Sequence, residues 1–375
     1  MKIQEKTMKK KIEIIAFYLP QYYPTPNNDQ WWGKGFTEWT NVAKAKRLYP
    51  GHYQPKIPSE LGFYDLRLPQ VRDAQAELAK EAGIEGFCYY HYWFSQGNEE
   101  LDLPFKEVVA TGKPDFPFCL CWANESWYSK FWNKDGTAEK QLLAEQLYLG
   151  ESDNEAHFNS LLNAFKDKRY IKVDGRLLFL IYQPLKFEHF PEFKEQWNRL
   201  AEKNGLPGFY FVAQTLFADK IDEILSLGFD GVNHCHRLDN IFQYDRSARP
   251  LIILTNLIKK FLKIPFIVPY KRAIKNCVRK EDYRENVYAT MMPNWDHTPR
   301  SADGGTVLHN STPELFKIHA KDILSTTINK SDSHKIVFLK SWNEWGEGNY
   351  MEPDLRYGKG YINALHNALE DYNRK

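Results

Sequence analysis

The feature that most constrains the fold is a regular alternation of short apolar runs with amphipathic segments of helical periodicity. Eight apolar runs occur along the chain, at residues 12–19, 84–92, 116–122, 176–182, 208–213, 229–233, 286–291 and 335–341. Runs that are apolar throughout are typical of parallel strands that are covered on both faces. The count of eight predicts a (β/α)8 TIM barrel of the α/β class. An open doubly wound sheet is disfavoured, because no glycine-rich nucleotide fingerprint follows the first run.

The chain length suits one such barrel with long loops. We expect a single catalytic domain over residues 1–375, with residues 1–11 as a flexible amino-terminal tail. We also expect a long polar and aromatic loop over residues 21–68, a helix over about 137–166, and a basic insertion at about 235–285. The formal net charge of +2 argues against a nucleic-acid-binding protein, which usually carries a strong basic excess.

Cysteine usage and the amino terminus bear on the cellular setting. The five cysteines are odd in number, and their spacing fits neither a disulfide framework nor a zinc site. We therefore expect reduced, mostly buried thiols, and neither a metal nor another cofactor. The sequence also has no apolar stretch typical of a signal peptide and no run long enough to span a membrane, so we expect a cytoplasmic protein.

The segment 336–350 carries the strongest chemical signal. A short apolar run ends there in Glu344 and Glu347, which are interleaved with two tryptophans and two glycines. Glycosidases use a pair of carboxyl groups beside the scissile bond, and aromatic rings supply apolar walls for sugars. The pattern favours a pair of catalytic acids over the alternative, which is a solvated acidic turn with capping roles.

The carboxyl ends of the other predicted strands are rich in aromatic, amide and acidic residues, and TIM-barrel enzymes place their sites at these ends. The candidate sugar-binding residues are Tyr18, Glu38, Trp39, His91, Trp122, Asn124, Glu125, Tyr182, His234, Trp295, Asp296, Arg300, Trp342, Asn343 and Trp345. Alternatives stay open for several of them. His91 and His234 also fit hydrogen-bonded core histidines. Asp296 and Arg300 also fit an ion pair with each other, and Glu38 also fits a surface acid.

Five segments carry a resemblance to a known family. They read IAFYLPQYYPTPNNDQWWGKGFTEWTNV, GFCYYHYWF, FCLCWANESW, MMPNWDHTPR and SWNEWGEGNYMEPD. These segments resemble the WbsX-like proteins, which are similar to glycoside hydrolase family 99, the endo-α-mannosidases and endo-mannanases. The resemblance runs from about residue 12 to 372.

This resemblance implies a (β/α)8 barrel in which Glu344 and Glu347 are the catalytic acids. It also implies a retaining mechanism through a 1,2-anhydro sugar. In that mechanism an ionised Glu344 takes the proton of the substrate's 2-hydroxyl, which attacks C1. A protonated Glu347 protonates the leaving oxygen and then activates water or another acceptor.

The expected function is therefore that of a retaining endo-glycosidase or transglycosidase acting on α-mannoside-like linkages in an oligo- or polysaccharide. The first alternative is a glycosyltransferase of O-antigen or capsular polysaccharide biosynthesis, a role often attached to WbsX-like proteins. The second is a non-catalytic glycan-binding barrel. The stretch 257–280 has basic residues among Leu, Ile and Phe and no acidic residue. It suggests either peripheral contact with an anionic membrane or a helical cap with a solvated basic face.

Overall fold

The computed structural model describes residues 12–132, 138–235, 261–275 and 277–374. The predicted amino-terminal tail and residues 236–260 of the predicted insertion lie outside the described residues.

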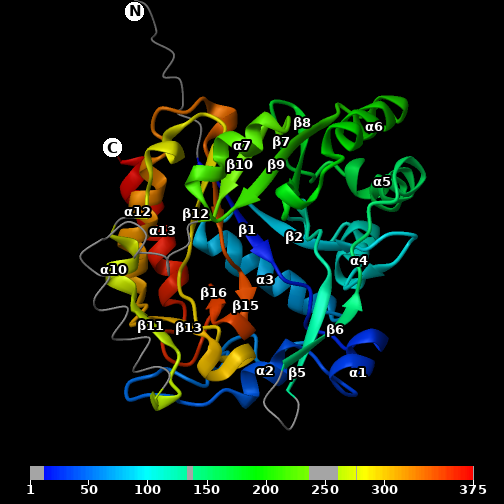
Figure 1. The fold of residues 1–375 in the computed structure, drawn as a ribbon. Helices are drawn as coiled ribbons and strands as arrows, with labels where there is room; N and C mark the ends of the chain where they lie inside the picture. Colours follow the sequence, from blue (N-terminus) through cyan, green and yellow to red (C-terminus); the bar gives the residue numbers. More distant parts are fainter. Residues whose placement is uncertain (1–11, 133–137, 236–260, 276, 375) are drawn as a thin grey trace, which may run out of the picture.

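Eight parallel strands form a closed barrel at the centre of the structure (Figure 1). The strands are β1 (Glu13–Tyr18), β2 (Gly86–Trp93), β4 (Phe118–Trp122), β8 (Arg176–Ile181), β9 (Phe209–Thr215), β10 (Gly231–His234), β12 (Val287–Met291) and β14 (Ile336–Leu339). Each strand pairs in parallel with the next one in this order. Strand β14 pairs with β1, with Val337 opposite Ile14, and so closes the barrel. The predicted TIM barrel is confirmed.

Helices surround the barrel, and all but α10, which lies in the predicted insertion, occur in segments with a helical pattern (Figure 1). They are α3 (Pro69–Ala82), α4 (Leu103–Thr111), α5 (Glu151–Phe165), α6 (Phe190–Lys203), α7 (Ile221–Ser226), α10 (Tyr270–Ile274), α12 (Pro313–Ser325) and α13 (Gly360–Asn373). Local signals fix their ends. Helix α3 begins with a proline, and Gly83 stops it in a left-handed conformation with φ of 85°. The Thr312 side chain caps α12 by accepting a hydrogen bond from the backbone N–H of Leu315.

Two predicted segments differ from the observed structure. The expected loop over residues 21–68 contains two short helices, α1 (Pro26–Trp32) and α2 (Glu38–Lys44), each preceded by a threonine. The expected helix over 137–166 begins only with α5. Before it, β6 (Ala138–Ala144) pairs antiparallel with β5 (Trp127–Trp132). The sequence of β6 is rich in helix-forming residues, so pairing with β5 overrides its local propensity.

Small sheets build the loops around the barrel. After β12, strand β13 (Thr306–His309) pairs in parallel with β11 (Phe266–Pro269). After β14, β15 (Asn343–Glu344) pairs antiparallel with β16 (Asn349–Tyr350). Two further short strands, β3 (Glu99–Glu100) and β7 (Lys172–Val173), pair antiparallel with β2 and β8.

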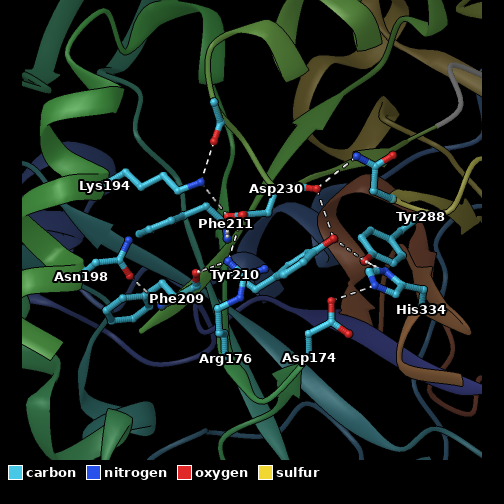
Figure 2. Close-up of polar contacts among 12 residues, drawn as sticks. Asp174, Arg176, Lys194, Asn198, Phe209, Tyr210, Phe211, Asp230, Tyr288 and His334 are labelled. Atoms are coloured by element: carbon cyan, nitrogen blue, oxygen red, sulfur yellow. Dashed lines mark hydrogen bonds and ion pairs between the residues drawn. The ribbon is translucent and has the colours of Figure 1, made fainter. Parts of the chain in front are cut away.

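Side chains around Asp230 tie together the amino-terminal ends of several barrel strands (Figure 2). The Asp230 carboxylate lies 3.0 Å from the Arg176 guanidinium and 3.0 Å from the Lys194 ammonium. The Tyr210 hydroxyl donates to the Asp230 carbonyl at 3.2 Å, and the Tyr288 hydroxyl donates to Tyr210 at 3.0 Å. Contacts at the amino-terminal ends of TIM-barrel strands contribute to stability, and functional sites lie at the carboxyl ends.

All five cysteines are free and buried, as predicted. Burial raises the pKa of Cys235 to about 11 and that of Cys277 to about 12, so both stay protonated near neutral pH. Within the described ranges, no helix combines the length and the apolar character needed to cross a bilayer.

Candidate active site

The hairpin that follows β14 carries both predicted catalytic acids. Its two short strands, β15 and β16, are joined by a single 3-10 turn, η8 (Trp345–Glu347). Neighbouring atoms leave no room for a side chain at either glycine of the turn. A Cβ atom at Gly346 would lie 1.7 Å from Oε2 of Glu38. Gly348 has a φ of 54°, and a Cβ atom there would lie 2.7 Å from that of Asp296. The glycines therefore let other loops pack directly against the turn that bears Glu347.

Arg300 joins Glu347 to a second carboxylate. Its Nη1 lies 2.6 Å from Oε1 of Glu347, and its Nε and Nη2 each lie 3.0 Å from Oε2 of Glu38. Glu38 begins α2, Arg300 lies in α11 (Thr298–Ser301), and Glu347 ends η8. One guanidinium thus connects the loops that follow β1, β12 and β14. A rigid, planar donor group is suited to this bridging role.

The two catalytic candidates have opposite electrostatic environments. Burial would raise the pKa of Glu347, but the Arg300 and Lys340 cations and a hydrogen bond with Glu344 outweigh it and lower this pKa to about 2. Burial and the Glu347 charge raise the pKa of Glu344 to about 8. The hydrogen-bonded pair therefore holds one proton near neutral pH, on Glu344. This is the reverse of the protonation that the resemblance implies, because Arg300 forms its ion pair with Glu347.

An open pocket of about 640 Å³ lies beside Glu347, at the carboxyl ends of β8, β9, β10, β12 and β14. Tyr182, Trp295, His297 and Lys340 are among its lining residues. The rings of Trp295 and His297 stack at a centroid distance of 6.1 Å, and Lys340 Nζ lies 5.7 Å from the Trp295 ring centre. The pocket thus offers an aromatic wall beside an acid, an arrangement that suits a sugar ring.

Five of the predicted sugar-binding residues lie at or near this pocket. Tyr182 and Trp295 line it. Arg300 contacts Glu347 directly, and Glu38 contacts Arg300. Burial is the main cause that raises the pKa of Glu125, and the Glu347 charge also contributes to this shift. The strand-end argument therefore points to residues that the structure brings together near Glu347, among them the ion-paired Glu38 and Arg300.

The other ten predicted sugar-binding residues do not line this pocket. These residues are buried in the structure, and they are Tyr18, Trp39, His91, Trp122, Asn124, His234, Asp296, Trp342, Asn343 and Trp345. Trp345, for example, donates from Nε1 to Glu352 at 2.6 Å, and its ring stacks on Tyr350 at 3.7 Å. Asn343 bonds both the N–H and the carbonyl of Leu19. Strand-end aromatics and amides here pack the barrel end and pair its buried backbone groups.

Three polar predictions are resolved in favour of interior contacts. His91 lies 2.8 Å from His157, and Nδ1 of His234 lies 2.7 Å from Asp282, so both are hydrogen-bonded core histidines. Asp296 does not pair with Arg300. It binds His52 at 2.8 Å and the Gln54 amide at 2.7 Å. These buried polar groups are satisfied by protein partners, as buried polar groups usually are.

Among the pocket residues that sequence reasoning missed are Lys340 and His297, two ionisable groups close to Glu347. Burial would lower the pKa of Lys340, but the charges of Glu344 and Glu347 hold it above its usual value. A lysine directly after the apolar run of β14 was the available signal, because lysine is seldom buried without a partner. His297 lies 3.7 Å from Glu347, and burial lowers its pKa. It lies inside the segment MMPNWDHTPR, in which only Trp295, Asp296 and Arg300 are predicted to bind sugar.

Comparisons with known proteins agree with this architecture. A family profile described as glycosyltransferase WbsX matches residues 14–365. A protein described as uncharacterized protein WxcX, from two strains of Xanthomonas campestris pv. campestris, is 32% identical over 357 residues. That match covers 95% of this chain and 49% of the relative, so the chain spans about half the length of the curated relatives it matches.

Two solved structures share the fold. The GH99 endo-alpha-mannosidase from Bacteroides thetaiotaomicron superimposes with a TM-score of 0.53 and 14% identity, over 96% of this chain and 97% of that one. A glycoside hydrolase-like protein superimposes with a TM-score of 0.58 and 13% identity, over 98% of this chain and 97% of that one.

We predict that Arg300→Gln raises the pKa of Glu347 by about one to three units, because the change removes the cation that stabilises its carboxylate. Carbon-13 NMR titration of labelled glutamate carboxyls would measure this shift, with the Glu347 signal assigned by its loss in Glu347→Gln. Arg67→Gln is the matched control, since Arg67 pairs with Asp65 at an exposed position. An unchanged Glu347 titration in Arg300→Gln would contradict the proposed electrostatics.

Proposed function

Because the chain belongs to the WbsX glycosyltransferase family, we propose that it is a carbohydrate-active enzyme. Its proposed activity is that of a retaining endo-glycosidase or transglycosidase on α-mannoside-like linkages in an oligo- or polysaccharide. The observation that carries the proposal is the hydrogen-bonded pair of Glu344 and Glu347 at the carboxyl end of a TIM barrel, beside an aromatic-walled pocket.

The closeness of the two carboxyl groups supports a substrate-assisted mechanism. In common retaining glycosidases the nucleophile and the acid lie roughly 5–5.5 Å apart, which is more than a hydrogen bond spans. A shared hydrogen bond suits two groups that both handle protons. In the proposed step the 2-hydroxyl oxygen bonds to C1 and the bond from C1 to the leaving oxygen breaks. Glu344 receives the 2-hydroxyl proton, and Glu347 gives its proton to the leaving oxygen.

The hydrogen bond between the acids also reconciles the resting protonation with these roles. In the free protein the shared proton lies on Glu344, whereas the reaction needs it on Glu347. A single transfer across the hydrogen bond turns Glu344 into the base and Glu347 into the acid. A leaving oxygen that enters beside Glu347 would compete for its contact with Arg300 and so favour this transfer.

The family description favours a second candidate, a glycosyltransferase of O-antigen or capsular polysaccharide assembly. A nucleotide-dependent transferase would be stabilised against thermal unfolding by a nucleotide-sugar donor, whereas a glycosidase would not respond. A non-catalytic glycan-binding barrel, the third possibility, would have no activity to lose on substitution of Glu344 or Glu347.

We predict that Glu347→Gln lowers kcat/KM on α-manno-oligosaccharides by about 10²- to 10⁴-fold, the usual contribution of general acid catalysis. The same variant should still release fluoride from α-mannosyl fluoride in the first turnover, because fluoride leaves without a proton, whereas later turnovers lack the base that activates water. Glu344→Gln should lose activity on both substrates, because the 2-hydroxyl still needs its base. Glu195→Gln, on the exposed face of α6, is the matched control. These roles would be contradicted if α-mannosyl fluoride restored activity to Glu344→Gln but not to Glu347→Gln.

We also propose that the stretch 257–280 makes peripheral contact with an anionic membrane. Its first four residues lie outside the described residues. In the described part, Phe261 and Leu262 expose 85% and 65% of their surface. Lys271 and Lys275 are exposed and carry no ion pair within the part of the chain that the structure describes. Apolar side chains flanked by cations are suited to insertion among anionic headgroups.

We predict that the protein co-sediments with phosphatidylcholine vesicles that contain phosphatidylglycerol, and that added salt weakens the association. Phe261→Asp and a Lys271→Glu, Lys275→Glu double variant should each bind about tenfold or more weakly. Phe63→Asp is the control, since Phe63 exposes 51% of its surface elsewhere on the molecule. Wild-type protein that stays in the supernatant with anionic vesicles would refute the contact.

A further inference from the structure

The pocket beside Glu347 has two walls of different chemistry. The acid and Lys340 belong to the segment after β14, whereas the loops after β8 and β9 line the pocket from across the barrel. These loops and helix α7 contribute an apolar wall made of Pro184, Leu185, Leu216, Phe217 and Ile224. Leu185 and Leu216 expose 45% and 44% of their surface. When an apolar group of a ligand covers such exposed aliphatic surface, its burial contributes favourable free energy to binding.

Polar groups near this apolar wall already have protein partners. The Thr215 hydroxyl accepts a hydrogen bond from the backbone N–H of Phe217 at 3.1 Å. The Gln214 amide nitrogen donates to Asn233 at 3.1 Å. A sugar ring placed here would give up hydrogen bonds to water and find few replacements, which is costly for hydroxyl groups. The apolar wall therefore suits an apolar part of the substrate better than a further sugar.

The loop that contains Gly305 indicates which kind of apolar ligand group the apolar wall binds. Gly305 and Thr306 line the pocket, and the Gly305 carbonyl accepts a hydrogen bond from the N–H of Phe266. Phe266 begins β11, only a few residues after the exposed side chains of Phe261 and Leu262. The loop that lines the pocket is thus hydrogen-bonded to the segment that carries the exposed Phe261 and Leu262. This link between an exposed apolar pair and the pocket favours a hydrocarbon chain over a small substituent on a sugar.

We infer that the apolar wall binds the hydrocarbon chain of a lipid-linked saccharide, with the sugar next to the chain held beside Glu347. This inference rests on the proposed function, because the acids determine where the saccharide lies. It narrows the substrate class from a polysaccharide in general to a glycan carried on a lipid. The apolar wall would then discriminate between free and lipid-linked glycans through the chain alone.

Equilibrium binding to Glu347→Gln protein, which lacks the proposed acid, tests this inference without turnover. The ligands are methyl, butyl and octyl glycosides of one α-manno-disaccharide, kept below the concentration at which octyl glycosides form micelles. We expect Kd to fall with chain length, by about tenfold or more from methyl to octyl. A further Leu185→Asn, Leu216→Asn change should abolish this gain, so that methyl and octyl glycosides bind the changed protein with similar Kd values. Leu355→Asn, at an equally accessible leucine outside the pocket, should keep the gain.

Equal Kd values for the methyl and octyl glycosides would overturn the inference, as would a gain that survives in the Leu185→Asn, Leu216→Asn protein. The inference would also be overturned if a 6-deoxy sugar lowered Kd as much as the octyl chain does and longer chains lowered it no further. The wall would then bind a methyl group of the sugar. Tight octyl binding without any cleavage by wild-type protein would refute the proposed function alone. Cleavage of methyl glycosides without a gain from the chain would refute only this inference.

Discussion

The ion pair between Arg300 and Glu347 is the interaction on which the rest of the site depends. It brings together loops that are far apart in the sequence, because the same guanidinium also binds Glu38 from the loop after β1. The contact needs a turn after β14 with room for Glu38, and the missing Cβ of Gly346 provides that room. The positive charge of Arg300 stabilises the ionised form of Glu347 and so holds the pKa of that carboxyl below its usual value.

The consequence is that the two neighbouring acids share one proton. Glu347 stays ionised beside Arg300 and Lys340, and Glu344, buried next to that negative charge, keeps the proton. A pair of groups pushed apart in pKa by their surroundings is a common basis for acid and base roles in catalysis. Here the resting charges are opposite to those the proposed reaction needs, and in our proposal the proton moves across the hydrogen bond between the acids.

The barrel was predictable because each strand is a short, mostly apolar run between helix signals that do not depend on distant residues. The β5–β6 hairpin was not, since β6 consists of helix-forming residues and only its partner strand makes it extended. The acids were predicted from the motif around them, and their catalytic roles stay predictions. The burial of Trp342, Asn343 and Trp345 was not foreseen, because sequence does not show which side chains at a strand end point inward. The single-domain organisation and the cytoplasmic location stay predictions.

Proton NMR of the first-formed product tests the central claim most directly. Wild-type protein would be followed with an α-manno-oligosaccharide and no nucleotide sugar, at time points shorter than mutarotation. The account predicts that new α-anomeric signals appear first and that Glu347→Gln produces none. First appearance of the β-anomer would contradict the retaining mechanism. Turnover only after a nucleotide sugar is added would contradict glycosidase chemistry altogether.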